Sequence, residues 1–399
     1  MNLREHPIHS MSSYLGGFPP RTPRGIIEQL VPPRVTVLDP FCGSGTTLVE
    51  AKLSGRKAIG VDLNPLAVAL ARAKLATVSL SDLLFRLSEL ARGFRGESEI
   101  DDIPDTLTPI FHRRTLAHLC YLRRQLSLAT LEDAFLRGAV AGIMHGKGRR
   151  DGSTAYLSVD MPNTFSMSPN YVRRFVEQNG LQAPPVDVFT KLRERCHWLL
   201  RSGPLPSSPR THVLAGDATR LPAVLEESGV QSVGAIVTSP PYLGVLRYGA
   251  FNWIRLWFLG YDQHQVDSVL DGTDSLDVYL SFMASFLESA SQVMRPGGIV
   301  ALVIGDVVER GQHVQLAARV WEELAGVVPF EAVQIMLDPY DQSSKTTRVW
   351  GKDRMGRATP LDRVLVLRRL STRRANGTLA RWRRAAQQPV AAAGAARRR

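Results

Sequence analysis

The chain has 399 residues, 44% of them hydrophobic and 22% charged, which is the balance of a globular protein and excludes wholesale disorder or a fibre. Its apolar runs are broken by Gly, Arg or Asp before the roughly 18 residues of a membrane helix, and three widely spaced cysteines exclude a disulfide framework and a Cys-pair zinc cluster. The N-terminal residues lack the apolar stretch of a signal peptide, so we expect a cytoplasmic protein.

The net charge of +12 is concentrated at one end of the chain. Ten arginines and no acidic residue lie within residues 364–399, and subtracting these ten leaves +2 for everything before. A tail of this kind either binds phosphates without sequence preference or is a solvated, disordered end, and the composition does not decide between the two.

A repeated strand–turn–helix pattern predicts the fold class. The β-branched run 35–38 is followed by a Gly-rich turn and by helical spacing over 46–53; a second strand is predicted over 57–61, and Pro65 opens a helix. Alternating units of this kind predict a parallel sheet covered by helices. Further strands are predicted at 211–214, 234–237 and 298–304, with a closing pair at 332–337 and 363–367.

A mostly helical insertion is predicted between the two halves of this pattern. Its apolar spacing indicates helices around 116–126, 131–143 and 187–200, with a polar, Gly-rich loop over 145–153. The predicted organisation is a cofactor-binding half (1–80), the insertion (81–209), a catalytic half (210–370) and a basic, disordered tail (371–399).

The first loop with a chemical signal follows the first strand. Residues 39–47 read Asp-Pro-Phe-Cys-Gly-Ser-Gly-Thr-Thr, in which the glycines let the backbone turn tightly and approach a ligand at a helix N-terminus. Asp62 ends the second strand, where an acidic residue is placed to hold ribose hydroxyls, whereas Asn64 is the better placed helix N-cap. Asp217 also follows a strand, and alone it is equally well read as a helix cap.

The second loop follows the strand at 234–237. Residues 238–242 read Thr-Ser-Pro-Pro-Tyr, and the two prolines hold the chain rigid at the carboxyl edge of the sheet, where α/β sheets bind ligands. Ser239 and the neighbouring carbonyls offer hydrogen-bond acceptors, and Tyr242 offers a flat face on which a base could stack.

Together the two loops resemble the signature motifs of the DNA amino-methyltransferases, which methylate exocyclic amines with S-adenosylmethionine. The Ser-Pro-Pro-Tyr form is similar to the cytosine-N4 branch, since adenine-N6 enzymes more often carry Asp or Asn at the position of Ser239. Residues 13–20, 246–249 and 294–298 are similar to further landmarks of the family. The resemblance covers about residues 10–76 and 212–367.

The resemblance implies an α/β fold with a class I (Rossmann-like) methyltransferase sheet, S-adenosylmethionine as cofactor, double-stranded DNA as partner and no metal. The implied cofactor-binding residues are Tyr14, Asp39, Pro40, Phe41, Cys42, Gly43, Gly45, Thr46, Thr47, Asp62, Leu63, Asp217 and Ala218. The implied catalytic residues are Ser239, Pro240, Pro241 and Tyr242. In the family, the Ser hydroxyl and the next carbonyl accept hydrogen bonds from the amine of a flipped-out base, and the Tyr stacks on that base.

The chain departs from many cytosine-N4 enzymes in two ways. Its cofactor half precedes its catalytic half, and little chain follows the last strands, so we assign target recognition to the insertion by location. The candidate phosphate contacts are Lys147, Arg149, Arg150, Arg173 and Arg174, with Arg247 beside the catalytic loop; solvated surface charge is the alternative for each. An adenine-N6 enzyme, an RNA amino-methyltransferase and an inactive nucleic-acid-binding regulator stay as alternatives. A cognate restriction endonuclease and the oligomeric state are left open.

Overall fold

The computed structural model describes residues 5–127, 129–148, 154–161, 167–209, 211–226, 228–241, 248–270, 275–309, 312–339 and 361–371. Four candidate site residues fall outside them, Arg149, Arg150, Tyr242 and Arg247, as does nearly all of the basic tail. Within the described part of the chain, no helix has the length and apolar character needed to span a bilayer.

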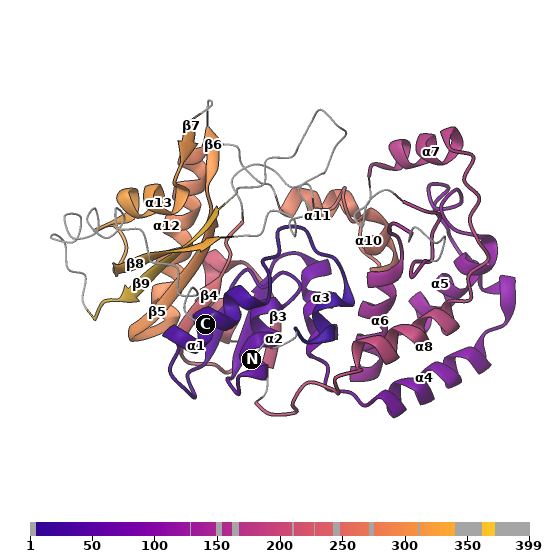
Figure 1. Ribbon diagram of the computed structural model, residues 1–399, viewed down its shortest axis with the longest axis horizontal. Coiled ribbons are helices and arrows are strands. Elements are labelled where there is room, and N and C mark those ends of the chain that lie inside the picture. Colours follow the sequence, from indigo (N-terminus) through magenta and orange to yellow (C-terminus); the bar gives the residue numbers. More distant parts are fainter. Residues whose placement is uncertain are drawn as a thin grey trace, which may run out of the picture.

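A seven-stranded sheet in the order β3-β2-β1-β4-β5-β9-β8 forms the centre of the molecule (Figure 1). Its strands are β1 (Val37–Asp39), β2 (Ala58–Asp62), β3 (Thr211–Ala215), β4 (Val233–Thr238), β5 (Met294–Gly305), β8 (Phe330–Pro339) and β9 (Leu361–Arg369). The first five in this order are parallel, and β9 runs antiparallel to both β5 and β8. This confirms the predicted α/β fold, including the closing pair of strands. A separate short hairpin joins β6 (Val307–Glu309) to β7 (Gln312–Val314).

Alternating side chains of the strands face two apolar cores. On β5, Ala301 and Val303 belong to one core, whereas Val300 and Leu302 belong to the other, as the two-residue period of a strand requires. The helices of the cofactor half are η1 (Pro7–Met11), α1 (Arg21–Leu30), α2 (Thr46–Leu53) and α3 (Pro65–Leu75). Those of the catalytic half are η3 (Ala218–Arg220), α9 (Leu221–Glu226), α10 (Trp253–Leu259), α11 (Gln263–Val269), α12 (Leu276–Val293) and α13 (Leu316–Leu324).

The insertion is helical, as predicted. It contains α4 (Leu80–Gly93), η2 (Gly96–Glu99), α5 (Arg113–Gln125), α6 (Leu131–Ile143), α7 (Pro169–Gln178) and α8 (Val188–Leu199). Its buried side chains, such as Leu136 and Leu192, belong to the same core as Leu48 and Leu66 of the cofactor half. Figure 1 shows α10, from the catalytic half, lying against this helical group. One continuous core therefore joins the insertion to the sheet.

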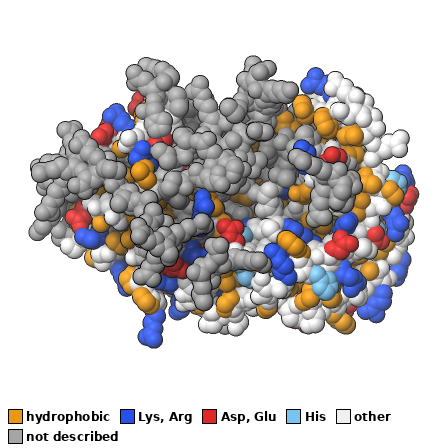
Figure 2. Space-filling view, viewed as in Figure 1, with side chains coloured by type: hydrophobic (Ala, Val, Ile, Leu, Met, Phe, Trp, Pro, Cys, Tyr) orange, Lys and Arg blue, Asp and Glu red, His pale blue; other side chains and the backbone are white. Residues whose placement is uncertain are grey.

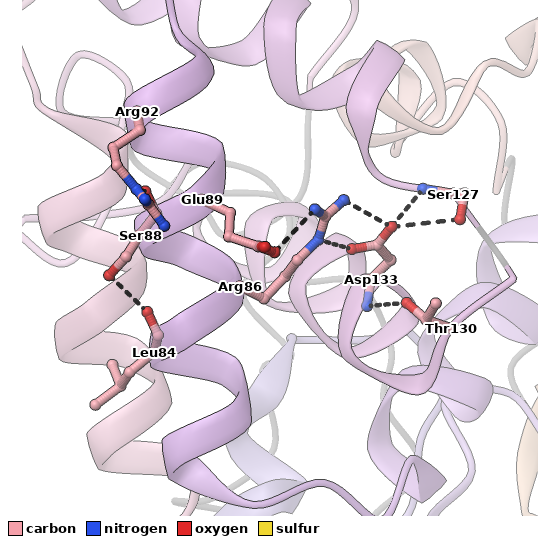
Figure 3. Close-up of polar contacts among 8 residues, drawn as sticks. All are labelled: Leu84, Arg86, Ser88, Glu89, Arg92, Ser127, Thr130 and Asp133. Carbon is pink, nitrogen blue, oxygen red and sulfur yellow. Dashed lines mark hydrogen bonds and ion pairs between the residues drawn. The ribbon is translucent and has the colours of Figure 1, made fainter.

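A polar cluster fastens α4 to the start of α6 (Figure 3). Arg86 donates from Nε to Oδ1 of Asp133 at 2.8 Å and from Nη2 to Oδ2 at 3.3 Å. The backbone N–H of Ser127 also donates to this carboxylate, and Thr130 Oγ1 caps α6 by accepting from the Asp133 N–H. Because the Asp133 side chain is nearly fully buried, removing Arg86 would leave a desolvated carboxylate with fewer partners.

Two glycines on α6 let neighbouring segments approach its backbone. A Cβ atom on Gly142 would overlap the carbonyl oxygen of Met11, and one on Gly138 would overlap Cβ of Ala73 on α3. The end of η1, at Met11 and Ser12, therefore packs directly against α6 of the insertion.

Replacing Gly142 by alanine should lower the free energy of unfolding by about 1–3 kcal/mol or more, because backbone must move to admit the methyl group. Gly25→Ala on α1 is the matched control: no atom lies within 4 Å of its added Cβ, so stability should rise by about 0.5–1 kcal/mol. Urea unfolding of both variants gives the comparison, and equal changes would contradict the close approach.

Candidate active site

A cavity of about 340 Å³ opens at the carboxyl ends of four neighbouring strands. Its lining includes the residues that directly follow β1, β2, β3 and β4, namely Pro40, Leu63, Gly216 and Ser239. The carboxyl edge of a parallel sheet is where such folds bind ligands. The two loops singled out in the sequence thus meet in one cavity.

Most of the candidate residues line this cavity. They are Tyr14, Pro40, Phe41, Cys42, Gly43, Thr46, Asp62, Leu63, Asp217 and Ala218 of the cofactor set, and Ser239, Pro240 and Pro241 of the catalytic set. Asp39, Gly45 and Thr47 are not among the lining residues, and Tyr242 lies outside the described residues.

The Gly-rich turn after β1 requires its glycines. Gly43 and Gly45 have φ values of +49° and +84°, in the left-handed region that residues with a Cβ rarely adopt. A Cβ atom on Gly43 would lie 3.1 Å from the Tyr14 ring, and one on Gly45 would lie 3.1 Å from Cβ of Ala71. The turn therefore packs between the Tyr14 ring and α3.

The carboxylate of Asp62 organises the same turn. Its Oδ2 accepts a hydrogen bond from the Gly43 N–H and its Oδ1 accepts one from the Asn64 N–H, both at 2.8 Å. Desolvation of the carboxylate raises the pKa of Asp62 to about 6, whereas these backbone hydrogen bonds lower it. Asn64 caps α3 by accepting from the Leu66 N–H, as expected, and its Nδ2 donates to the Tyr14 hydroxyl at 3.1 Å.

Asp39 lies beneath the cavity and joins the two signature loops. The Thr238 hydroxyl donates to its Oδ1 at 2.5 Å, and the Phe41 N–H donates to the same oxygen at 3.3 Å. Asp39 is nearly fully buried, which raises its pKa to about 7. Its side chain holds Thr238, the residue before Ser239, in place, and its predicted cofactor contact stays a prediction. Thr47 is fully buried.

A buried lysine supports the turn from the side of α3. Lys74 is 2% exposed and donates from Nζ to Oγ of Ser44, a lining residue, at 2.9 Å. Burial lowers the pKa of Lys74 to about 7. Sequence reasoning missed this residue, because a lysine on an amphipathic helix ordinarily faces solvent.

Asp217 caps a helix and also lines the cavity, so the cap predicted as one alternative is present and its cofactor contact stays a prediction. It lines the cavity, and its Oδ1 accepts from the N–H and the hydroxyl of Thr219, each at 2.8 Å, to cap η3. The carboxylate is thereby oriented at the cavity rim.

Aromatic and aliphatic side chains of α11 and α12 complete the wall. Phe41 packs against Phe282 and Phe286 of α12, with ring centroids 5.7 and 4.9 Å apart. Tyr248 stacks on Tyr14 at 6.0 Å. Phe282 and Phe286 were not predicted, because the cavity-facing turns of α12 have the same apolar spacing as turns that face the core.

Three of the candidate phosphate contacts lie within the described residues. Lys147 is exposed near the end of α6, and Arg173 and Arg174 are exposed on α7. None of the three is among the lining residues. Figure 2 shows basic side chains interspersed with acidic ones on the visible face, without a single dominant basic patch among the coloured residues.

Comparison with known proteins shows similarity to DNA methylases. A family model described as DNA methylase matches residues 4–73, which contain the Gly-rich turn and Asp62. The type II methyltransferase M.MvaI of Kocuria varians is 23% identical over 288 residues, covering 66% of this chain and 61% of that protein. M.BsoBI of Geobacillus stearothermophilus is 40% identical over 60 residues, covering 15% of this chain and 12% of that protein. The chain is therefore similar to DNA methylases, with the family match over residues 4–73.

This chain spans less than two thirds of the length of those relatives. Among solved structures, the rRNA methyltransferase aviRa from Streptomyces viridochromogenes is similar over 92% of this chain and 94% of its own, with a TM-score of 0.37 and 16% identity.

The cofactor of the amino-methyltransferase family is S-adenosylmethionine, and the cavity residues fit it. Gly43 provides a turn without a Cβ at the cavity wall, and Asp62 and Asp217 offer carboxylate acceptors suited to ribose hydroxyls. Phe41, Leu63 and Phe282 offer apolar faces suited to an adenine ring. No group of His, Cys, Asp or Glu side chains able to hold a metal ion occurs among the residues described.

Proposed function

We propose that this protein is a site-specific DNA methyltransferase that transfers the methyl group of S-adenosylmethionine to the exocyclic N4 amine of cytosine. One observation carries the proposal: Ser239, Pro240 and Pro241 line the same cavity as Gly43 and Asp62. An amine held at the Ser-Pro-Pro turn therefore shares one enclosed space with a cofactor held by the Gly-rich turn.

The two prolines make the turn a surface of acceptors. Pro240 and Pro241 have no backbone N–H, and a residue that precedes proline is restricted to extended conformations. The Ser239 hydroxyl and the Pro240 carbonyl can thus accept hydrogen bonds from an amine, which localises the nitrogen lone pair away from the ring. Asp39 fixes the start of this turn through Thr238. When bound, S-adenosylmethionine supplies an activated methyl group, and positioning of the amine supplies much of the rate.

Duplex DNA is the proposed substrate, and the target base would leave the helix to reach the cavity. We assign recognition of the surrounding sequence to the insertion, where the exposed Lys147, Arg173 and Arg174 would contact phosphates. A restriction–modification role, with a cognate endonuclease as partner, is supported by the type II names of the relatives.

The test is transfer of labelled methyl groups from S-adenosylmethionine to a set of unmethylated genomic DNAs and to total RNA, with the nucleosides separated afterwards. We expect label in N4-methylcytosine from DNA. Label in N6-methyladenine would keep the fold and cofactor but assign the other branch, and label only in RNA would overturn the substrate. Protein that binds S-adenosylhomocysteine yet labels neither would contradict the activity.

A further inference from the structure

Arg255 of α10 is a buried guanidinium outside the cavity lining. It is 1% exposed, and its three nitrogens donate to acceptors from three parts of the chain. Nε donates to the Ala141 carbonyl on α6 at 3.1 Å, and Nη1 donates to Oδ1 of Asn252 at 3.0 Å. The Ser13 carbonyl accepts from Nη1 at 3.3 Å and the Ser13 hydroxyl accepts from Nη2 at 3.0 Å.

These four acceptors are neutral, although the group they surround is a cation at neutral pH. Burial lowers the pKa of Arg255 to about 10, which still leaves it protonated. Burying a charge is costly, and apolar side chains of similar volume often stabilise a fold more than a buried charged group does. We therefore attribute the role of Arg255 to the chain segments that its planar guanidinium connects through hydrogen bonds, and not to a gain in stability.

The first of these segments forms a wall of the cavity. Ser13 is followed directly by Tyr14, whose ring lies against Gly43 and whose hydroxyl accepts from Asn64 Nδ2. The position of Tyr14 is thus set on one side by the Gly-rich turn and on the other by the backbone that Arg255 holds.

The second segment leads away from the Ser-Pro-Pro turn. Asn252, which accepts from Arg255, donates from its Nδ2 to the Tyr248 carbonyl at 2.9 Å. The Tyr248 ring in turn stacks on Tyr14 at an interplanar angle of 25°. A closed chain of contacts therefore runs from Arg255 through Asn252 and Tyr248 to Tyr14, and back through Ser13.

The same helix is anchored to the insertion. The Trp253 indole N–H donates to the Met167 carbonyl, two residues before α7, at 2.7 Å. Arg255 itself reaches Ala141 beside Gly142, where the Met11 backbone is pressed on α6. A displacement of the insertion would thus be transmitted to α10 and to both cavity walls.

We propose that Arg255 is a positioning residue that holds the cofactor-side wall at Tyr14 and the target-side wall at Tyr248 as one unit. The inference rests on the proposed function of the cavity. It implies that cofactor and target binding favour one another by the same factor, because both stabilise one arrangement of the two walls.

The test uses full-length Arg255→Met and Arg255→Lys, with S-adenosylhomocysteine as ligand in isothermal titration calorimetry. We expect affinity to fall at least tenfold in Arg255→Met. Lysine should restore little of it, because an ammonium group on a single stem cannot reproduce the planar fork. Asn252→Ala removes the hydrogen bonds that join Arg255 to the Tyr248 carbonyl and should also weaken S-adenosylhomocysteine binding. This variant tests the inference if the Arg255 variants do not fold.

Arg56→Met is the matched control. Arg56 is buried and donates to the backbone carbonyls of Val31 and Ser54 at 2.8 and 3.2 Å, before the start of β2 and thus at the opposite end of that strand from the cavity. Its loss should lower stability without changing affinity per folded molecule. A merely structural role for Arg255 would give the same result as this control.

Hydrogen exchange supplies a second readout. In the wild type, bound S-adenosylhomocysteine should slow amide exchange in residues 13–17 and 62–66; in Arg255→Met at saturating ligand, the protection should persist at 62–66 and be lost at 13–17. Wild-type affinity and an unchanged protection pattern in Arg255→Met would overturn the inference. Failure of the wild type to bind S-adenosylhomocysteine would instead contradict the cofactor role of the cavity.

Discussion

Replacing Ser239 by alanine should reduce methyl transfer by a factor of about 10²–10³, the loss typical of removing one positioned hydrogen-bonding group from a reacting centre. The hydroxyl is one of two acceptors that the turn offers to the amine, and the Pro240 carbonyl alone would hold it in more than one orientation. Affinity for S-adenosylhomocysteine should change less than about twofold, because Asp62 and the Gly-rich turn are untouched.

Two comparisons make this result interpretable. Ser285→Ala removes a hydroxyl from an exposed position on α12 and should leave both activity and binding unchanged. Single-turnover rates at saturating cofactor separate the chemical step from binding. Retention of more than half of the wild-type rate in Ser239→Ala would exclude the hydroxyl from the reaction.

Replacing Asp62 by asparagine should weaken S-adenosylhomocysteine binding by about 10- to 100-fold at pH 8, since a hydrogen bond to a charged group contributes about 1.5–3 kcal/mol. The carboxylate accepts from the Gly43 and Asn64 N–H groups through separate oxygens. An amide has one acceptor oxygen, so its NH₂ group would face one of these donors. Both the turn and the ribose acceptor would be disturbed. Calorimetric titration of the variant beside the wild type measures the change.

The raised pKa of Asp62 predicts that ligand affinity decreases as the pH falls. Its pKa in the free protein is about 6, so below pH 6 ligand binding must displace a proton, and wild-type affinity should fall about tenfold per pH unit. The affinity of the Asp62→Asn variant should show no such dependence on pH. Because Asp39 is present in both proteins, the difference between their profiles reports on Asp62. Parallel pH profiles between pH 5 and 8 would contradict the role of Asp62.

Protonation of Asp62 does not itself favour unfolding. Because the pKa of Asp62 in the folded protein lies above the value of an unperturbed Asp, the folded state binds this proton more tightly than the unfolded state. The contribution of Asp62 to stability therefore increases as the pH falls through about 6. Circular dichroism at each pH verifies that the protein stays folded.

The strands were predictable because each carries a local signal. The runs at 57–61, 211–214 and 298–304 combine β-branched residues with turn residues, and the structure places a strand at each. Their order in the sheet has no local signal, because β4 pairs with β1 across nearly two hundred intervening residues. Only packing between distant segments decides such a pairing.

The candidate site divides in the same way. The glycines of the turn after β1 and the prolines after β4 impose backbone conformations that a sequence reveals directly. The buried position of Asp39 depends on its hydrogen bond with Thr238, and the position of Arg255 depends on Ser13, more than two hundred residues away. Contacts of this range leave no spacing that could be recognised in one sequence.

Because we assign target recognition to the insertion, the single core that it shares with residues 1–80 limits how target specificity can change. Excising residues 81–209 would uncover Ala73 of α3 and the Met11 backbone, which pack against Gly138 and Gly142, so recombination cannot simply exchange the insertion between relatives. A new recognition sequence must instead arise by point substitution on outward faces such as that of α7. Divergence of specificity in this lineage should then proceed in small steps, with intermediates of relaxed selectivity, while α6 and its glycines stay fixed.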